Sequence, residues 1–200
     1  MYIFSGWTFS SSKDKDTTLV GDDTDLIMLL LYYYDVTSND LIFKPEAKRN
    51  AKQRIWAMKS VKTKLGTELC SNVFFIHALL GCDTTSRVFG IGKGSALKKF
   101  VDCSYFREQA SVFNRTNASR EDIIEAGERA LVSLLNGRRG EKLDYLRYRK
   151  YCEKLANRKV QVQPQNLPPT SAAAEKHSLR VYLQVRQLKG EDVSPTEAQK

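Results

Sequence analysis

The chain has 200 residues, of which 42% are hydrophobic and 28% are charged. This composition is typical of a globular protein and excludes the collagen-like, disulfide-scaffold and wholly disordered classes. Lys and Arg number 32 against 23 Asp and Glu, and the resulting net charge of +9 favours a polyanionic partner such as nucleic acid.

The cysteines and the apolar runs indicate the environment in which the protein functions. The four cysteines form no C-x-x-C pair, which favours a reducing, intracellular environment over a zinc or disulfide framework. The longest apolar run, 26–34, is about half of the roughly 20 residues that a membrane-spanning helix needs. We therefore expect no membrane partner.

The first half of the chain has an α/β pattern. Residues 1–16 show no hydrophobic period, and we expect them to be disordered. Residues 17–20 are a β-type run that ends in an acidic turn at 21–25, and an apolar helix follows from Leu26. A second short strand at 41–43 completes a βαβ-like unit, which predicts a parallel or mixed sheet.

A basic segment follows the second strand. Apolar residues recur at helical spacing over 46–69, and this pattern predicts an amphipathic helix. Residues 44–64 hold eight basic residues and one acidic residue, a local charge of +7. The lysines on the polar face are Lys48, Lys52, Lys59 and Lys62. A solvated helix face and a phosphate-binding face both fit this pattern.

The rest of the chain is mainly helical by pattern. An apolar helix at 73–80 precedes a second acidic turn, a glycine-rich hairpin and a further helix. Three more helices are predicted, at 119–135, 141–157 and 171–188, with Ser119 as an N-cap. We expect a disordered tail at 191–200.

Three carboxylates crowd the first acidic turn: Asp22, Asp23 and Asp25. The turn follows a strand, where open α/β sheets bind their ligands. Like charges this close repel, so water, helix N-terminal amides or a cation must offset them. Mg²⁺ is a natural partner because it prefers oxygen ligands. The alternative is that Asp22 or Asp23 only caps the following helix.

A second candidate site begins at Asp83, just after the apolar helix. The hairpin Gly90-Ile91-Gly92 and then Lys93 follow it. Small residues let backbone amides approach a phosphate, and Lys93 adds a positive charge. The alternative is an ordinary helical hairpin with glycines for steric reasons. The spacing matches neither a Walker A loop nor a dinucleotide fingerprint.

Together these segments resemble the flap endonuclease branch of the PIN-like nuclease superfamily. The blocks that carry the resemblance are Gly21-Asp22-Asp23-Thr24-Asp25-Leu26, Ala78-Leu79-Leu80-Gly81-Cys82-Asp83 and Gly90-Ile91-Gly92-Lys93-Gly94-Ser95-Ala96-Leu97. The resemblance implies that Asp23, Asp25 and Asp83 bind Mg²⁺ or Mn²⁺ in a two-metal site. It also implies that Gly90, Gly92, Lys93 and Gly94 contact the backbone of duplex DNA.

A set of uncharacterised invertebrate proteins with a PIN-like core resembles the chain more closely. They share Ile76-His77-Ala78 before Gly-Cys-Asp-Thr-Thr-Ser, and also Leu167-Pro168-Pro169-Thr170 with His177-Ser178-Leu179-Arg180-Val181-Tyr182 after it. The resemblance implies that 17–110 is the C-terminal half of a PIN-like core with a helix-hairpin-helix, and that 111–190 is a helical extension.

The chain departs from the family at its start. PIN-like flap nucleases carry further acidic ligands on a first strand and on a helix before the acidic turn, and this chain starts too late to hold them. We expect a truncated metal-dependent nuclease-type domain that is weakly active or inactive alone, unless a partner chain completes it. DNA is favoured over RNA as substrate, and a nuclear location over a cytoplasmic one. The alternatives are a non-catalytic nucleic-acid-binding remnant and a helical protein-interaction module at 119–188.

Several other residues have mainly structural interpretations. A core or capping role is favoured for His77, and packing of a helix end on the sheet is favoured for Tyr32, Tyr33 and Tyr34. Trp56 is the better candidate for stacking on a base, because it lies in the basic segment.

Overall fold

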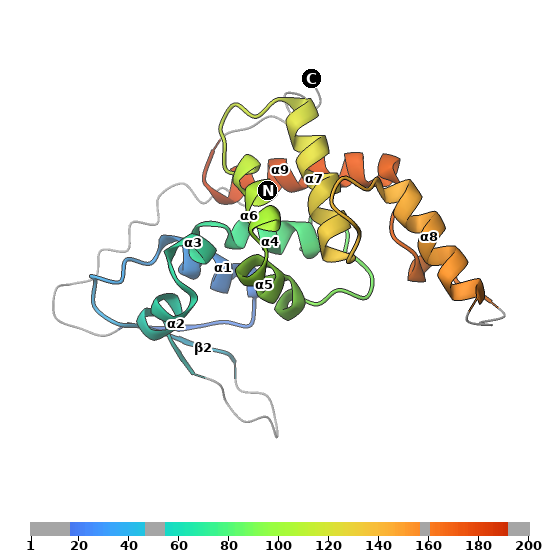
Figure 1. The fold of residues 1–200 in the computed structure, drawn as a ribbon. Helices are drawn as coiled ribbons and strands as arrows, with labels where there is room; N and C mark the ends of the chain where they lie inside the picture. Colours follow the sequence, from blue (N-terminus) through green and yellow to red (C-terminus); the bar gives the residue numbers. More distant parts are fainter. Residues whose placement is uncertain (1–16, 47–54, 157–160, 192–200) are drawn as a thin grey trace. The chain divides into compact units, whose positions relative to one another are not determined.

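The structure is a computed structural model that describes residues 17–46, 55–156 and 161–191 (Figure 1). The chain divides into two compact units, Met1–Phe74 and Phe75–Lys200. The predicted disordered segment at 1–16, and residues 192–200 of the predicted disordered tail at 191–200, lie outside the described residues. Each unit is described by itself below.

The first unit contains a three-stranded mixed sheet in the order β1-β2-β3. β1 (Thr17–Val20) pairs in parallel with β2 (Leu41–Lys44), and β2 pairs in antiparallel with β3 (Trp56–Ala57). Helix α1 (Thr24–Tyr33) connects the two parallel strands, and its Leu30 and Leu31 are buried. The α/β fold class and the βαβ-like unit are therefore confirmed, while a PIN-like core remains a prediction.

The predicted basic helix is wrong at its described start. Trp56 and Ala57 form strand β3, and the helical region is broken into α2 (Met58–Leu65) and α3 (Thr67–Ser71). Trp56 pairs with Phe43 of β2, and their rings stack with centroids 5.8 Å apart. Gly66 separates the helices with a φ of 80°, a conformation that glycine adopts readily. Strand pairing and this glycine override the helical pattern.

The second unit is helical. Its helices are α4 (Val73–Leu80), which begins in the first unit, α5 (Lys93–Asp102), α6 (Ser104–Val112), α7 (Arg120–Leu134), α8 (Leu143–Ala156) and α9 (Ser171–Leu188), and a 3₁₀ turn lies at Pro164–Asn166. Helix α6 was not singled out in the sequence. No helix in the described ranges is both long and apolar enough to cross a bilayer.

Helix α7 packs closely on α9 and on α6. A Cβ atom at Gly127 would lie 1.9 Å from Ser178 Oγ, so glycine permits the close approach of α7 and α9. Phe75, Phe106 and Phe113 pack together in the core, with ring centroids 4.6 to 5.8 Å apart in the two pairs that Phe75 makes. The boundary between the compact units falls at Phe74, and α6 packs on α7 within the second unit, while the predicted division between a PIN-like core and a helical extension at 110 remains a prediction.

Local capping signals set the helix starts. Ser119 Oγ accepts a 3.1 Å hydrogen bond from Asp122 N at the start of α7, as predicted. Thr170 Oγ1 accepts a 3.2 Å bond from Ala173 N at the start of α9, whose bounds match the predicted helix. These side chains satisfy backbone N–H groups that have no partner within the helix.

Candidate metal and nucleic-acid sites

The acidic turn predicted at 21–25 runs from the end of β1 into the first turn of α1, which starts at Thr24 and not at the predicted Leu26, so Asp25 is a helix residue. Asp23 Oδ1 accepts a 2.9 Å hydrogen bond from Asp25 N and caps α1. Asp22 Oδ1 accepts a 3.0 Å bond from Glu46 N, which ties the turn to the end of β2. The capping role that the sequence offered as an alternative is therefore present for Asp23.

The same turn retains the chemistry of a cation ligand. Asp22 and Asp23 are exposed and Asp25 is half-buried. A carboxylate has about four lone-pair positions, so the hydrogen bond that Asp23 accepts from Asp25 N leaves room for a metal ion. The N-terminal end of α1 also offsets the negative charge of the turn. Asp23 and Asp25 thus fit a hard divalent ion by donor type.

Asp83 lies at the exposed tip of a tight turn in the second unit. Gly81 precedes the turn with a φ of 103°, and a Cβ atom there would lie 2.6 Å from Arg87 Cα. Thr85 Oγ1 donates a 2.7 Å bond to Ala78 O and accepts a 3.1 Å bond from Cys82 N. These contacts fix the backbone that presents Asp83.

Helix α9 holds this turn from the other side. Thr84 Oγ1 donates a 2.6 Å hydrogen bond to Gln184 Oε1. His177 Nε2 lies 2.9 Å from Leu79 O at the end of α4. Thr84 and Leu79 are 100 and 98 positions away in sequence from the residues of α9 that they contact. No local sequence pattern could therefore predict these two contacts.

The glycine hairpin before α5 presents an open backbone. Gly90 has a φ of 77°, and Gly92 is the N-cap of α5 without a side-chain capping bond. A Cβ atom at Gly90, Gly92 or Gly94 would meet no atom of the described chain within 4 Å. Packing therefore does not require glycine at Gly92 or Gly94, and a ligand can approach this backbone closely. Lys93 is the half-buried first residue of α5.

The four lysines that are predicted to bind phosphate differ in their positions and contacts. Lys62 Nζ donates to Tyr32 O at 3.0 Å and to Tyr34 O, and it thereby caps the C-terminal end of α1. Lys59 is exposed on α2. Lys48 and Lys52 lie outside the described residues. The structural role of Lys62 depends on a segment 28 to 30 positions away.

The aromatic residues of the first unit serve in packing. Tyr32 stacks on Phe74 with centroids 4.4 Å apart, and the buried Tyr34 donates a 3.0 Å bond to Asn39 O. Trp56 is half-buried and stacks on Phe43, so the ring that the sequence offered for base stacking packs on β2. His77 is buried in α4, in agreement with the core role.

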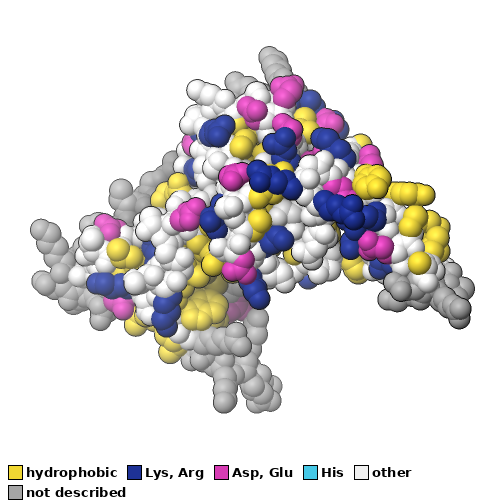
Figure 2. Space-filling model, viewed as in Figure 1, with side chains coloured by type: hydrophobic (Ala, Val, Ile, Leu, Met, Phe, Trp, Pro, Cys, Tyr) yellow, Lys and Arg dark blue, Asp and Glu magenta, His cyan; other side chains and the backbone are white. Residues whose placement is uncertain are grey.

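Helix α8 carries an unexpected apolar outer face. Leu143 and Leu146 are buried on one side, while Tyr145, Tyr148 and Leu155 are 47% to 65% exposed. Hydrophobic side chains are visible along α8 in Figure 2. This exposed apolar face is relevant to the alternative function that the sequence offered, a helical protein-interaction module at 119–188.

The predicted metal ligands belong to both units. Asp23 and Asp25 lie in the first unit and Asp83 in the second. Within the three described ranges, no three or more His, Cys, Asp or Glu side chains lie close enough together to hold a metal ion. Comparisons with protein-family models, with curated proteins and with solved structures found no match.

Proposed function

We propose that the chain is a metal-dependent nuclease-type domain that acts on the phosphodiester bonds of nucleic acid. The acidic turn at the carboxyl end of β1 is the observation that carries this proposal. β1 pairs in parallel with β2, and α1 begins within the turn, with Asp23 as its N-cap and Asp25 in its first turn. Ligands of open α/β sheets bind at this position.

Each group in the proposal has a separate task. Asp23 and Asp25, together with Asp83, would hold Mg²⁺ or Mn²⁺. When bound, such an ion activates water as a nucleophile and stabilises the leaving oxygen. The open backbone at 90–94 and the Lys93 ammonium group would bind phosphate oxygens.

Calorimetric titration with Mn²⁺ tests the metal ligands directly. The wild-type chain is compared with the triple variant Asp23→Asn, Asp25→Asn and Asp83→Asn. We expect saturable binding in the wild type and none in the variant, because an amide is a much weaker ligand than a carboxylate for a hard cation.

A matched control changes three exposed carboxylates outside the acidic turns, by Asp102→Asn, Glu108→Gln and Glu121→Gln. This variant removes the same charge and should bind Mn²⁺ as the wild type does. Equal loss in both variants, or no binding by a folded wild type, would remove the support for the metal site.

A non-catalytic nucleic-acid-binding domain is the second candidate. It is favoured by the use of Asp22 and Asp23 oxygens in backbone hydrogen bonds, and by the lack of a three-ligand group in the described parts of the chain. This function predicts DNA binding that weakens with salt and is unchanged by EDTA and by the triple Asp→Asn variant. DNA affinity that requires Mn²⁺ would contradict it.

A further inference from the structure

An arginine pair in the second unit lies beside residues of two neighbouring helices. Arg138 and Arg139 lie in the loop between α7 and α8. The guanidinium carbon of Arg139 lies 4.6 Å from the centroid of the Tyr105 ring on α6. Lys99 Nζ of α5 lies 3.4 Å from Asn136 Oδ1 in the same loop. We call Lys99, Tyr105, Arg138 and Arg139 the arginine cluster.

The loop that carries the two arginines is held in one conformation. Gly137 N donates a 2.8 Å bond to Val132 O, and Arg138 N donates a 2.7 Å bond to Glu141 Oε2. Glu141 is held in turn by the guanidinium of Arg149 at 2.9 Å. The loop is therefore preorganised, and a ligand of the arginines would lose little affinity to ordering of the backbone.

Neither guanidinium group donates a hydrogen bond within the described parts of the chain, although Arg138 interacts electrostatically with Glu141. Stacking on Tyr105 occupies the face of the Arg139 guanidinium, and its in-plane N–H groups remain available. Neither arginine side chain forms an ion pair within the described ranges. Other arginines of this unit do pair with carboxylates: Arg120 with Glu175, Arg129 with Glu125, Arg149 with Glu141 and Arg186 with Glu191.

The surroundings of the arginine cluster are basic. Residues 93–108, which cover α5 and most of α6, and the two arginines together hold six basic and two acidic residues, a local charge of +4. Lys93 of the glycine hairpin lies on the same helix as Lys99. Lys and Arg side chains are frequent over α5 and the end of α7 in Figure 2. The cluster thus extends the positive charge of the hairpin.

We infer that the arginine cluster binds the phosphodiester backbone of a nucleic acid. This inference rests on the nucleic-acid part of the proposed function and is independent of the metal ligands. A guanidinium fork matches two phosphate oxygens. Lys93 and Lys99 lie about 9 Å apart along the α5 axis and about 120° apart around it, so they present separate charges. Several separate cationic groups suit a polyanion better than a single anion.

Fluorescence anisotropy of the full chain with a labelled 20-base-pair DNA duplex in EDTA tests this inference. The double variant Arg138→Ala, Arg139→Ala should bind at least about 10-fold more weakly at low salt. The slope of log K against log salt should fall by about two, because each phosphate contact contributes about 0.9.

The matched control is Arg115→Ala, Arg180→Ala, which removes two charges from exposed arginines outside the cluster. It should change the affinity by less than about 2-fold, and equal losses in the two double variants would overturn the site. A second variant, Tyr105→Leu, keeps the charge but removes the stack. It should weaken binding several-fold, while Tyr105→Phe should restore it, and melting temperatures verify that each variant is folded.

Unchanged affinity in both Arg138→Ala, Arg139→Ala and Tyr105→Leu would overturn the inference and leave DNA binding itself intact. A wild type that binds phosphatidylserine vesicles and not DNA would also overturn it, and would identify an anionic membrane surface as the partner. The Mn²⁺ titration decides the metal site separately, so the two proposals can fail independently.

Discussion

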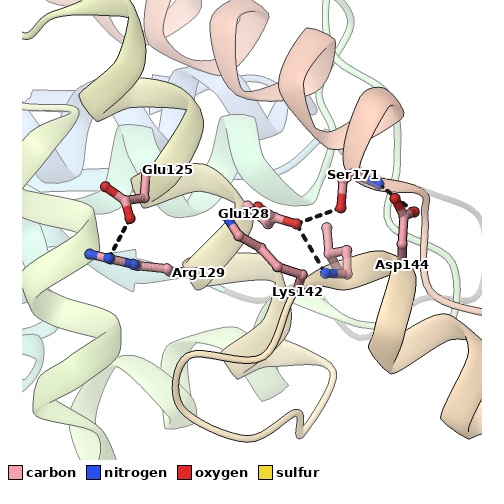
Figure 3. A network of polar contacts seen from close by, with 7 residues as sticks. Glu125, Glu128, Arg129, Lys142, Asp144 and Ser171 are labelled. Carbon is pink, nitrogen blue, oxygen red and sulfur yellow. Dashed lines mark hydrogen bonds and ion pairs between the residues drawn. The ribbon is translucent and has the colours of Figure 1, made fainter.

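Glu128 of α7 accepts a 2.6 Å hydrogen bond at Oε1 from the hydroxyl of Ser171, the first residue of α9 (Figure 3). The same oxygen accepts a 3.0 Å bond from Leu143 N at the start of α8, and Oε2 lies 2.9 Å from Lys142 Nζ. Glu128 is only 7% exposed. One buried carboxylate thus joins three helices, and its charge is balanced by donors from two of them.

Replacing Glu128 should destabilise the second unit. In Glu128→Gln, an amide NH₂ group replaces one of the two accepting oxygens, so either Lys142 Nζ or the pair of Ser171 Oγ and Leu143 N loses its acceptor. We expect a loss of about 1 to 3 kcal/mol in the free energy of unfolding, measured by urea denaturation. The control Glu125→Gln, on the same helix but in an exposed pair with Arg129, should change it by less than about 1 kcal/mol.

The contribution of Glu128 should depend on pH. Burial alone would raise the pKa of Glu128, yet hydrogen bonds from Ser171, Leu143 and Lys142 hold it below the ordinary value of 4.5. A depressed pKa means that the stabilisation is fully present above pH 4.5 and is lost as the pH falls through the pKa of the folded state. The difference in unfolding free energy between wild type and Glu128→Gln should therefore shrink below that pH. A constant difference from pH 7 to pH 3 would contradict this account.

His177 should make the fold sensitive to mild acid. Burial lowers the pKa of His177 below its ordinary 6.5, although its contact with Leu79 O opposes the shift, and no partner for Nδ1 lies in the described residues. The neutral ring is favoured, so the stability that it provides is present above pH 6.5 and is lost as the pH falls. The melting temperature should drop between pH 7.5 and pH 5.5 in the wild type and less in His177→Gln. Lys176→Gln, next to it but exposed, should behave as the wild type.

Lys62 and Lys59 should differ in how much each contributes to the stability of the fold. Lys62→Met removes the cation that caps α1, and we expect a loss of about 1 to 2 kcal/mol in stability, because hydrogen bonds from charged groups are among the stronger ones. Lys59→Met removes an exposed charge and should change stability by less than about 0.5 kcal/mol. If Lys59→Met proves the more destabilising change in urea denaturation, the capping role of Lys62 is wrong.

Gly94 offers a test of why the hairpin is rich in glycine. The methyl group that Gly94→Ala adds would meet no described neighbouring atom within 4 Å. Because alanine favours a helix more than glycine does and Gly94 lies in the first turn of α5, the variant should be more stable by up to about 1 kcal/mol. If a phosphate approaches this backbone, the added methyl group should still weaken DNA binding several-fold. Thermal melting and anisotropy on one preparation measure both effects. A variant that is more stable and binds DNA equally well would mean that no ligand approaches the backbone at Gly94.

The backbone of much of this protein follows from local patterns. The strand at 17–20, helix α1 after its acidic turn, and helix α9 at 171–188 agree with the predictions from hydrophobic spacing. The cap at Ser119 was also predicted, because the capping residue and the amide that it accepts from are three positions apart. Signals of this kind act within a few residues and can be recognised in the sequence alone.

The partners of the side chains were decided by the tertiary structure. Trp56 became a strand residue because Phe43 lies opposite it, and Lys62 became a cap because α1 ends beside it. The contacts of Arg139 with Tyr105 and of Gln184 with Thr84 join segments 34 and 100 positions apart. The sequence by itself determined the two parallel strands and most of the helices, since hydrophobic period and capping are local properties, while strand β3 required pairing with β2. Which charged groups are neutralised inside the protein, and which stay available to a ligand, depends on long-range packing that no local pattern encodes.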